Sequence, residues 1–373
     1  MSQFALTVSS LFDGHSIVSN KTIHVENGFI KAIENSKTST KLDYSGTLVA
    51  GFIDIQVNGG GGVLFNQSPD LSTIKQIAKA HQAFGTTGWL PTLITDSLDK
   101  MQQAADAVAS AHSQSIAGVL GIHFEGPHLS AAKKGIHPEQ YIRQLSAAEE
   151  ALYCRKDLGK ILLTLAPETV APEVISRLVD LGVTVCLGHS NANYQQAQSA
   201  LLAGATGFTH LFNAMSAFTS REPGMVGAAL MDQNCYYGLI LDGEHVHPAS
   251  AKLALSNNSN MILVTDAMPL VGVEQKQFQF FGKTIDRKNN RLTDSEGRLA
   301  GSVLDMKTAV NNCVQMLGIS QIQALNMASK LPAKFLGLDQ QYGTLAVGKK
   351  ASMVVLDEQG DIVANWVDGQ QVI

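Results

Sequence analysis

Ionisable side chains lie at the ends of several buried apolar runs of this sequence. Glu125 follows the run AGVLGIHF, His189 follows VTVCLG, and His210 lies within TGFTHL. A carboxylate at the end of a buried run is costly unless a positive group meets it. One carboxylate and two imidazoles form the ligand set of a catalytic zinc site whose fourth position is left for water. These residues therefore predict a site for one divalent ion, zinc in the first place, with iron, cobalt or manganese as alternatives.

Asp266 closes a further apolar run, MILVTD, and predicts an acid/base. A divalent ion lowers the pKa of water, and a neighbouring carboxylate can take the proton and pass it to a leaving group. The alternative is a helix or turn cap, because Asp is common after strands. Another run leads to Asp242 and His245, and the first run ends in the amides Gln56 and Asn58.

Other candidates have two interpretations each. His137 lies in the polar loop AAKKGIH and either reaches the site or is solvated. Arg221 either clamps a phosphate or carboxylate or lies on the surface. The glycines in NGGGG, residues 58–62, either let backbone amides approach an anion or form a plain turn. His123 shares a strand face with Glu125, and we expect it to be a packing residue.

The elements that must position these residues are short apolar runs that alternate with amphipathic, helix-like segments. Continuous apolar strands that alternate with helices predict a parallel sheet covered on both faces. Eight such units most naturally close into a (β/α)8, TIM-like barrel, whose catalytic groups lie at the carboxyl ends of the strands. An open doubly wound sheet is the alternative, but no run is followed by a G-x-G-x-x-G turn. The runs span residues 48–57, 88–94, 117–124, 161–166, 183–188, 206–211, 236–242 and 261–266.

Both ends of the chain are rich in strand and turn signals. The dipeptides Asn27-Gly28 and Asp368-Gly369 each predict a hairpin between alternating apolar segments. We expect the two ends to pair into a small β-sandwich, which places residues 1–48 and 336–373 in one domain and residues 49–335 in the barrel. A polar, hairpin-like insert at residues 273–302 follows the eighth run.

The composition is that of a globular protein. The 373 residues are 45% hydrophobic and 16% charged, with a formal net charge of -5. No basic block or stripe suggests a nucleic-acid partner, and no apolar run approaches the length of a membrane span. The first residues lack the features of a signal peptide, and the four cysteines have no paired spacing. We therefore expect a cytoplasmic protein with reduced thiols.

A set of motifs in this order resembles the N-acetylglucosamine-6-phosphate deacetylases of the amidohydrolase superfamily, between about residue 50 and residue 330. The motifs are GFIDIQVNGGGG, HFEGPHL, KKGIHP, GHSNA, THLFNAM, REPGMVG, DGEHV, VTDAM and LAGS. The resemblance implies a metal-dependent barrel with a small β-sandwich from both chain ends, and a homodimer. It implies hydrolysis of the acetamide of N-acetylglucosamine 6-phosphate to glucosamine 6-phosphate and acetate, in amino-sugar catabolism.

The same resemblance assigns roles to residues. Glu125, His189 and His210 would hold the metal, Asp266 would be the acid/base, and His137 would help to polarise the substrate carbonyl. Arg221 would come from the partner subunit, so that the site needs the dimer. The residues implied in substrate binding are Ile136, His137, Asn213, Ala214, Arg221, His245, Leu299, Ala300 and Gly301.

The first strand departs from a pattern that is common in the superfamily. Many members carry His-x-His there, which supports a second metal, whereas this chain has Gln56 and Asn58. An amide is a poor ligand beside imidazole. We therefore predict one tightly bound ion and group Gln56 with the metal residues, near the water or an empty second site.

Two other functions compete with the deacetylase. A cyclic amidohydrolase of the dihydroorotase or allantoinase kind, or a deaminase, usually has the His-x-His and often a bridging carboxylated lysine, and no lysine ends an apolar run here. A non-catalytic barrel scaffold is disfavoured, because all the proposed ligands and Asp266 are present.

Overall fold

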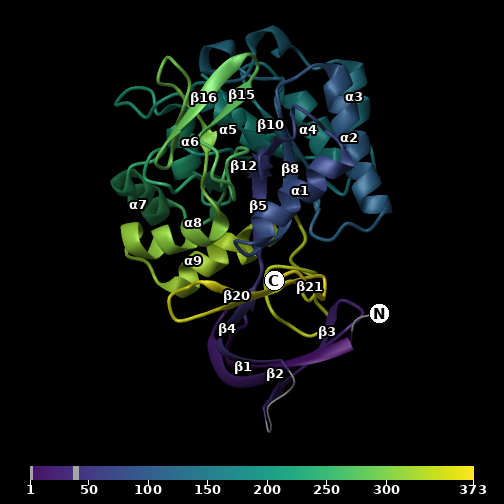
Figure 1. Cartoon of the computed structure of the whole chain (residues 1–373). Helices are drawn as coiled ribbons and strands as arrows, with labels where there is room; N and C mark the ends of the chain where they lie inside the picture. The colour runs from purple at the N-terminus through teal and green to yellow at the C-terminus, as the bar shows by residue number, and fades with distance from the viewer. Residues whose placement is uncertain (1–2, 37–41) are drawn as a thin grey trace.

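The middle of the chain forms an eight-stranded parallel sheet that curls into a nearly closed, TIM-like barrel (Figure 1). The computed structural model describes residues 3–36 and 42–373. Each of the eight predicted runs overlaps one barrel strand, so the predicted barrel is confirmed. In spatial order the strands are β5 (Phe52–Val57), β8 (Thr86–Ile94), β9 (Gly121–Glu125), β10 (Lys160–Leu165), β11 (Thr184–Leu187), β12 (Gly207–Phe208), β13 (Tyr236–Leu239) and β14 (Met261–Leu263).

The barrel closes where its first and last strands meet. Val57 and Ala267 form a parallel bridge, and the amide of Asp266 donates to the carbonyl of Gln56 at 3.0 Å. One detail of the prediction was wrong, because the first apolar run is not one strand but divides at Gly51. A Cβ on Gly51 would lie 2.1 Å from the Thr87 hydroxyl, so only glycine fits where the chain passes from the end sheet into the barrel.

Helices follow the strands and cover the outside of the barrel (Figure 1). Their apolar faces pack on the strands; α1, for example, buries Ile74 and Ile77, and the side chain of Asp70 caps its first turn. The helices are α1 (Leu71–Gln82), α2 (Leu98–Ser113), α3 (Ala147–Tyr153), α4 (Pro172–Asp180), α5 (Tyr194–Leu202), α6 (Gly224–Met231), α7 (Pro248–Asn257), α8 (Met306–Asn312), α9 (Gln321–Ala328) and α10 (Lys330–Phe335). A π-helical turn, Cys313–Leu317, extends α8.

The two chain ends form one seven-stranded sheet with its own apolar core, as the pairing of the ends predicted. Residues Asn27-Gly28 and Asp368-Gly369 make the two predicted hairpin turns, all with positive φ. In order the strands are β21 (Gln370–Gln371), β20 (Ile362–Val367), β19 (Met353–Leu356), β4 (Leu42–Ala50), β1 (Gln3–Phe12), β2 (Ile17–Glu26) and β3 (Phe29–Asn35). The division into domains at residues 48 and 336 remains a prediction.

The polar insert after β14 forms a small antiparallel sheet above the barrel rim. Ser302 returns to the barrel, where its amide donates to the carbonyl of Asp266 at 2.9 Å. The inner face of this sheet packs Phe280 and Ala300 against Met268 and Ile94. Its strands are β15 (Gln277–Phe280), β16 (Lys283–Lys288), β17 (Arg291–Thr293) and β18 (Leu299–Ser302).

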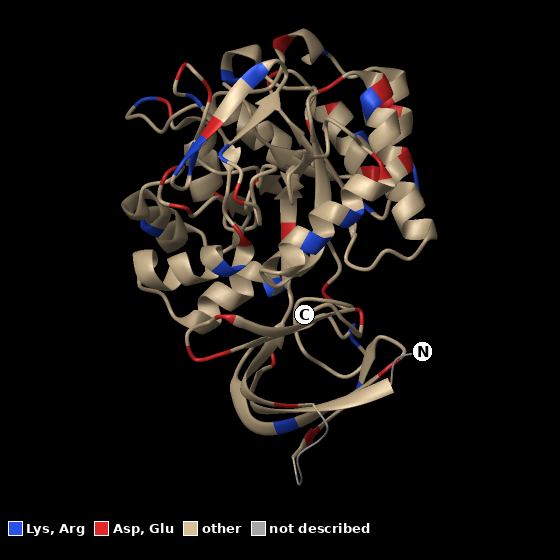
Figure 2. Ribbon diagram, viewed as in Figure 1, with Lys and Arg blue, Asp and Glu red and all other residues tan. Residues whose placement is uncertain are grey.

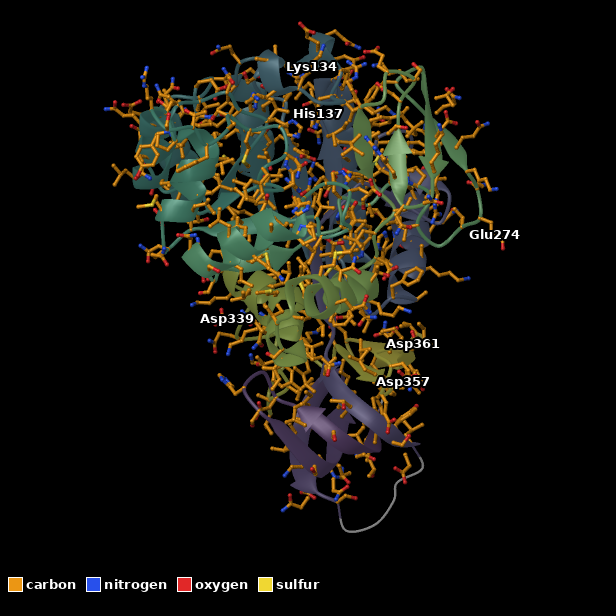
Figure 3. All side chains as sticks on the ribbon, turned by 90° about the vertical axis from the view of Figure 1, so that its left-hand side faces the viewer. Lys134, His137, Glu274, Asp339, Asp357 and Asp361 are labelled. Carbon is orange, nitrogen blue, oxygen red and sulfur yellow. The ribbon has the colours of Figure 1, made fainter. Side chains whose placement is uncertain are left out.

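Charged residues of both signs are spread over the molecule (Figure 2). In Figure 2, Lys and Arg are interspersed with Asp and Glu over the helices, and no large area of one sign is visible in that view. Among the described residues, no helix has both the length and the apolar character needed to cross a membrane. Figure 3 shows Lys134 and His137 at the end of the barrel that points away from the end sheet.

Candidate metal centre and pocket

The three predicted ligands converge at the carboxyl ends of their strands. Glu125 Oε1 lies 3.1 Å from His189 Nε2 and 3.0 Å from His210 Nε2, and the two Nε2 atoms are 3.0 Å apart. All three side chains are buried. Glu125 is the last residue of β9, and the histidines lie two residues beyond β11 and β12. The structure therefore brings together three groups that are 21 to 85 residues apart in the sequence.

The chemistry of this donor set fits a divalent cation. His189 Nδ1 lies 2.9 Å from the carbonyl of Lys133, which can only accept, so His189 Nε2 of the neutral ring presents a lone pair to the centre. The ligand atoms of Glu125, His189 and His210 all lie within 4.8 Å of one another. A carboxylate oxygen and two imidazole nitrogens that face one point need a positive charge between them.

Titration of the cluster points the same way. Burial would raise the pKa of Glu125, but its contacts with the rings of His189 and His210 outweigh this effect and hold the pKa well below its usual value. Burial would lower the pKa of His210, but its hydrogen bond to Glu125 outweighs that effect and raises it. The same environment that stabilises positive charge at His210 would stabilise a metal ion beside this ring.

Three residues of the site have left-handed backbone conformations. The φ angles of His189, His210 and Asp266 are 46°, 35° and 51°. Non-glycine residues rarely have such values, which cost of the order of 1 to 3 kcal/mol each and gather at functional sites. This conformation turns each side chain inward directly after its strand, and no sequence signal indicates it.

Asp266 lies beside the triad and is held by two amides. Asn58 Nδ2 donates to Asp266 Oδ1 at 2.6 Å, and Gln56 Nε2 donates to the same oxygen at 3.2 Å. Burial first, and the charge of Glu125 second, raise the pKa of Asp266 to about 6. A carboxyl that titrates near neutral pH can both take and return a proton.

Gln56 is placed differently from a ligand. Its Nε2 also donates to Glu125 Oε1 at 3.2 Å, so the amide N–H groups face the two carboxylates. An N–H donor orients carboxylates and does not ligate a cation. The grouping of Gln56 with the metal residues thus stays a prediction, and the geometry favours an orienting role.

A cavity of about 160 Å³ lies above the triad and receives most of the predicted substrate residues. His137 is 4% exposed, so its side chain is buried and not solvated. Its ring centroid lies 4.2 Å from that of His189. Burial and the neighbouring His189 lower the pKa of His137 well below its usual value. The lining includes Ile136, His137, Asn213, Ala214, His245, Leu299 and Gly301 from the predicted set.

His245 is oriented by an acidic neighbour at the same rim. His245 Nδ1 lies 2.6 Å from Asp242 Oδ2. Burial would raise the pKa of Asp242, but this hydrogen bond lowers it, so the carboxylate is ionised. The pair leaves His245 Nε2 as the free ring nitrogen in the cavity wall.

Two predicted substrate residues do not line the cavity in this chain. Arg221 is exposed in the loop between β12 and α6, and Ala300 is buried behind the lining. Within the segment 58–62, Gly59 and Gly60 form the short strand β6 (Gly59–Gly60), and Gly61 and Gly62 make the tight turn to β7 (Val63–Leu64). The amides of Gly61 and Gly62 donate to the carbonyls of Val271 and Pro269, so they do not face an anion.

The sequence analysis missed several residues of the lining. Asn58 was noted only as a polar strand end, although it makes the shortest contact to Asp266. Phe280 comes from the insert, which had been described only as a hairpin. Apolar residues at strand ends carry no signal that separates a cavity wall from core. The further missed lining residues are Ile94, Gly135, Ile240 and Met268.

Comparisons with known proteins agree with this geometry. The model of the amidohydrolase family matches residues 47–372. The chain is 50% identical to N-acetylgalactosamine-6-phosphate deacetylase of Shewanella sp. (strain ANA-3), over 93% of this chain and 90% of that protein. It is 32% identical to N-acetylglucosamine-6-phosphate deacetylase of Haemophilus influenzae, over 99% of each. The crystal structure of N-acetylglucosamine-6-phosphate deacetylase from Pasteurella multocida superposes with a TM-score of 0.94 at 34% identity and covers 99% of both chains.

Proposed function

The chain belongs to the amidohydrolase family, and on that premise we propose that it is a metal-dependent deacetylase that hydrolyses N-acetylglucosamine 6-phosphate to glucosamine 6-phosphate and acetate. The observation that carries the proposal is the convergence of Glu125, His189 and His210 within 4.8 Å, with Asp266 beside them in a cavity. Zinc is our first choice of metal, with iron, cobalt or manganese as alternatives.

Amide hydrolysis needs a nucleophile, a sink for the oxyanion and a proton for the departing amine. A divalent ion held by Glu125, His189 and His210 would supply Lewis acidity and ionise water at neutral pH. Asp266 has a pKa of about 6, so it can accept the proton of the nucleophile and return it to the amine. Asn58 and Gln56 fix the direction of its carboxylate.

The lining of the cavity contains both polar and apolar residues. Asn213 and His245 are polar lining residues that suit a sugar phosphate, and Ile136 and Leu299 are apolar lining residues. His137 stands beside the triad and would donate to the carbonyl oxygen as negative charge develops there. The phosphate would provide remote binding energy that orients the acetamide.

The phosphate site would be completed by a second copy of the chain. Arg221 is exposed and outside the cavity of its own chain, as a residue that reaches into a partner would be. Phe218, three residues before Arg221, is 61% exposed, and Met231, at the far end of α6, is 64% exposed. Exposed large apolar residues of this kind favour an interface. The proposal is therefore a homodimer in which Arg221 clamps the phosphate of the neighbouring site.

A second candidate substrate is N-acetylgalactosamine 6-phosphate, the epimer at one carbon. It is favoured by the 50% identity to the Shewanella protein, whose name specifies that sugar. The acetamide chemistry is the same for both, so the triad and Asp266 serve either. We also propose that the protein acts in the cytoplasm, where its four free cysteines would stay reduced.

The test is acetate release by the purified protein from each of the two phosphorylated sugars, with and without a chelator. Unphosphorylated N-acetylglucosamine and dihydroorotate are the controls. We expect chelator-sensitive turnover of at least one sugar phosphate and little turnover of the controls. Turnover of dihydroorotate alone would replace the deacetylase with a cyclic amidohydrolase, and the ratio of kcat/KM between the epimers decides the preferred sugar.

A further inference from the structure

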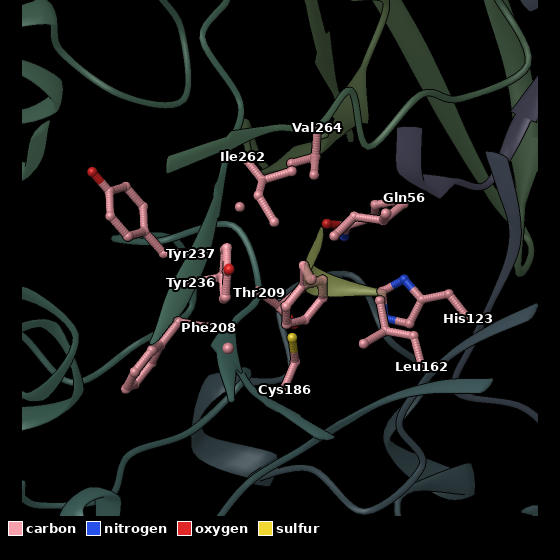
Figure 4. Close-up of a pocket in the computed structure, with 14 residues that line it drawn as sticks. Gln56, His123, Leu162, Cys186, Phe208, Thr209, Tyr236, Tyr237, Ile262 and Val264 are labelled. Carbon is pink, nitrogen blue, oxygen red and sulfur yellow. The ribbon is translucent and has the colours of Figure 1, made fainter. Parts of the chain in front are cut away.

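A chain of hydrogen-bonded polar side chains lies inside the barrel directly beneath the triad. His123 Nε2 lies 2.8 Å from Thr164 Oγ1, and Thr164 Oγ1 lies 2.6 Å from Thr209 Oγ1. All three residues are buried. Figure 4 shows His123 and Thr209 in the wall of a narrow interior cavity, together with Gln56 and apolar residues such as Leu162. We call these three side chains the hydroxyl–imidazole chain.

This chain connects two of the three strands that carry a ligand, β9 and β12. His123 lies on β9 two residues before Glu125, and Thr209 directly precedes His210. Thr164, on β10, carries no ligand but is the register partner of Glu125 across the sheet. The hydrogen bonds therefore run from the strand of one ligand to the strand of another, just below the point where the ligands meet.

The third ligand is held by packing between the two threonines. A Cβ on Gly188 would lie 2.8 Å from Thr164 Cγ2 and 2.9 Å from Thr209 Cβ. Gly188 directly precedes His189 on the strand that separates β10 from β12. The contact between the threonines thus passes over a residue that must be glycine, and it clamps the backbone from which His189 projects.

His210 depends on this support more than His189 does. The ring of His189 is held from behind by the carbonyl of Lys133. The Nδ1 atom of His210 has no hydrogen-bond partner in any other described residue. In addition, β12 is only two residues long, so few ladder hydrogen bonds fix the backbone at His210.

Stability alone does not account for the hydroxyl–imidazole chain. A buried hydrogen bond contributes only about 1 kcal/mol net, and valine has nearly the same shape as threonine. What hydrogen bonds add in a close-packed interior is a defined direction between the groups they join. Groups that support metal ligands from outside the coordination shell typically change metal affinity by 10- to 100-fold, on the order of 1.4 to 2.7 kcal/mol.

We propose that His123, Thr164 and Thr209 are positioning residues that brace the ends of β9, β11 and β12 so that Glu125, His189 and His210 converge on one ion. The inference rests on the proposed metal site, and it adds residues that touch neither the ion nor the substrate. It predicts that removing a single hydroxyl weakens metal binding in the absence of substrate.

The experiment measures zinc affinity by competition with a chelating dye, on the metal-free full-length protein. Thr164→Val and Thr209→Val should bind zinc about 10- to 100-fold more weakly than the wild type. Thr209→Ser keeps the hydroxyl and should restore affinity to within about 2-fold of the wild type. The matched control is Thr86→Val, because Thr86 is also a buried barrel threonine but its hydroxyl has no hydrogen-bond partner in the described structure.

Several outcomes would overturn the brace. One is that Thr164→Val and Thr209→Val bind zinc as tightly as Thr86→Val does. Another is that Thr209→Val loses zinc affinity and Thr209→Ser shows the same loss. If Thr164→Val does not fold, two other variants test the proposal. Thr209→Val removes only the end of the hydroxyl–imidazole chain, and Gly188→Ala separates the threonines while both hydroxyls remain. Each should weaken zinc binding.

The proposed function can fail separately. A wild-type protein that binds zinc and shows the predicted variant pattern, but releases no acetate, would refute the deacetylase and leave the brace intact. If the wild type deacetylates but binds zinc no more tightly than Thr209→Val does, the positioning role of the hydroxyl–imidazole chain is refuted and the deacetylase function stands. A wild-type protein that binds no zinc would refute both.

Discussion

The side-chain amide of Asn58 lies 2.6 Å from the carboxylate of Asp266, across the seam where the first and last barrel strands meet. A second carboxyl reinforces the seam, since Asp54 Oδ2 accepts from Thr265 Oγ1 at 2.5 Å. Burial raises the pKa of Asp54 to about 7. The position of Asp266, the proposed acid/base, is therefore fixed by the closure of the barrel itself.

Replacement of Asn58 by alanine should shift the pH dependence of activity. The hydrogen bond from Asn58 favours the ionised form of Asp266 and lowers its pKa. Without it the pKa of Asp266 rises above about 6, so less carboxylate is available between pH 6 and 7. We expect the acid limb of kcat/KM to move up by roughly one pH unit, with recovery at higher pH. An unchanged acid limb would show that Asn58 does not tune this group.

Asp266→Asn should abolish turnover without loss of metal. The amide cannot accept a proton at neutral pH, so kcat should fall about 10²- to 10⁴-fold. Metal content should stay that of the wild type, because the contacts within the triad do not include Asp266. Near-normal kcat in a metal-loaded Asp266→Asn protein would remove this residue from its role.

Thr95 should act on turnover through His137. The single proton of the Thr95 hydroxyl has two acceptors, His137 Nδ1 at 2.8 Å and the carbonyl of Glu125 at 3.3 Å. Donation to the nearer Nδ1 leaves the ring proton on Nε2, where it can reach a substrate oxygen. We expect Thr95→Val to lower kcat about 10-fold and His137→Ala about 10²- to 10³-fold.

A double-mutant cycle tests this coupling. If Thr95 acts only through His137, the double variant should be no slower than His137→Ala alone. Additive losses of kcat would instead mean that Thr95 supports the site by another route, for example through its contact to the backbone of Glu125.

Metal analysis should find about one ion per chain, and chelation should abolish activity until zinc or another divalent ion is restored.

The affinity for the metal ion should fall as the pH is lowered. Glu125 raises the pKa of His210, so a proton competes with the metal for this ring, and metal binding must release it. Two tightly held ions would refute the single site that Gln56 and Asn58 predict.

Arg221→Ala should raise KM for a phosphorylated sugar and leave KM for the unphosphorylated sugar nearly unchanged, as expected for lost uniform binding. Mixing this variant with Asp266→Asn tests the dimer directly. If Arg221 serves the partner, each mixed dimer contains one intact site. In a random 1:1 mixture, activity at substrate concentrations far below the KM of Arg221→Ala should then return to about a quarter of the wild-type value. No recovery in confirmed mixed dimers would place Arg221 in its own chain's site or outside both.

The sequence by itself determined the barrel and the identity of its principal groups. Apolar runs that alternate with helices are buried when the strands form a parallel sheet covered by the helices. The carboxyl ends of parallel strands then lie together at one rim of the barrel. Glu125, His189, His210 and Asp266 could therefore be read from run ends alone. The same local logic predicted the hairpin turns at both chain ends, since turn residues act on their immediate neighbours.

Only the tertiary structure decided how these groups are supported. The contact between Asn58 and Asp266 spans 208 residues, and the one between Thr164 and Thr209 passes over Gly188. The burial of His137 and the place of Phe280 in the cavity wall likewise depend on loops that fold back over the rim. Hydrogen bonds and burial between distant segments are set by the closed geometry of the barrel, and residue order carries no local signal for them.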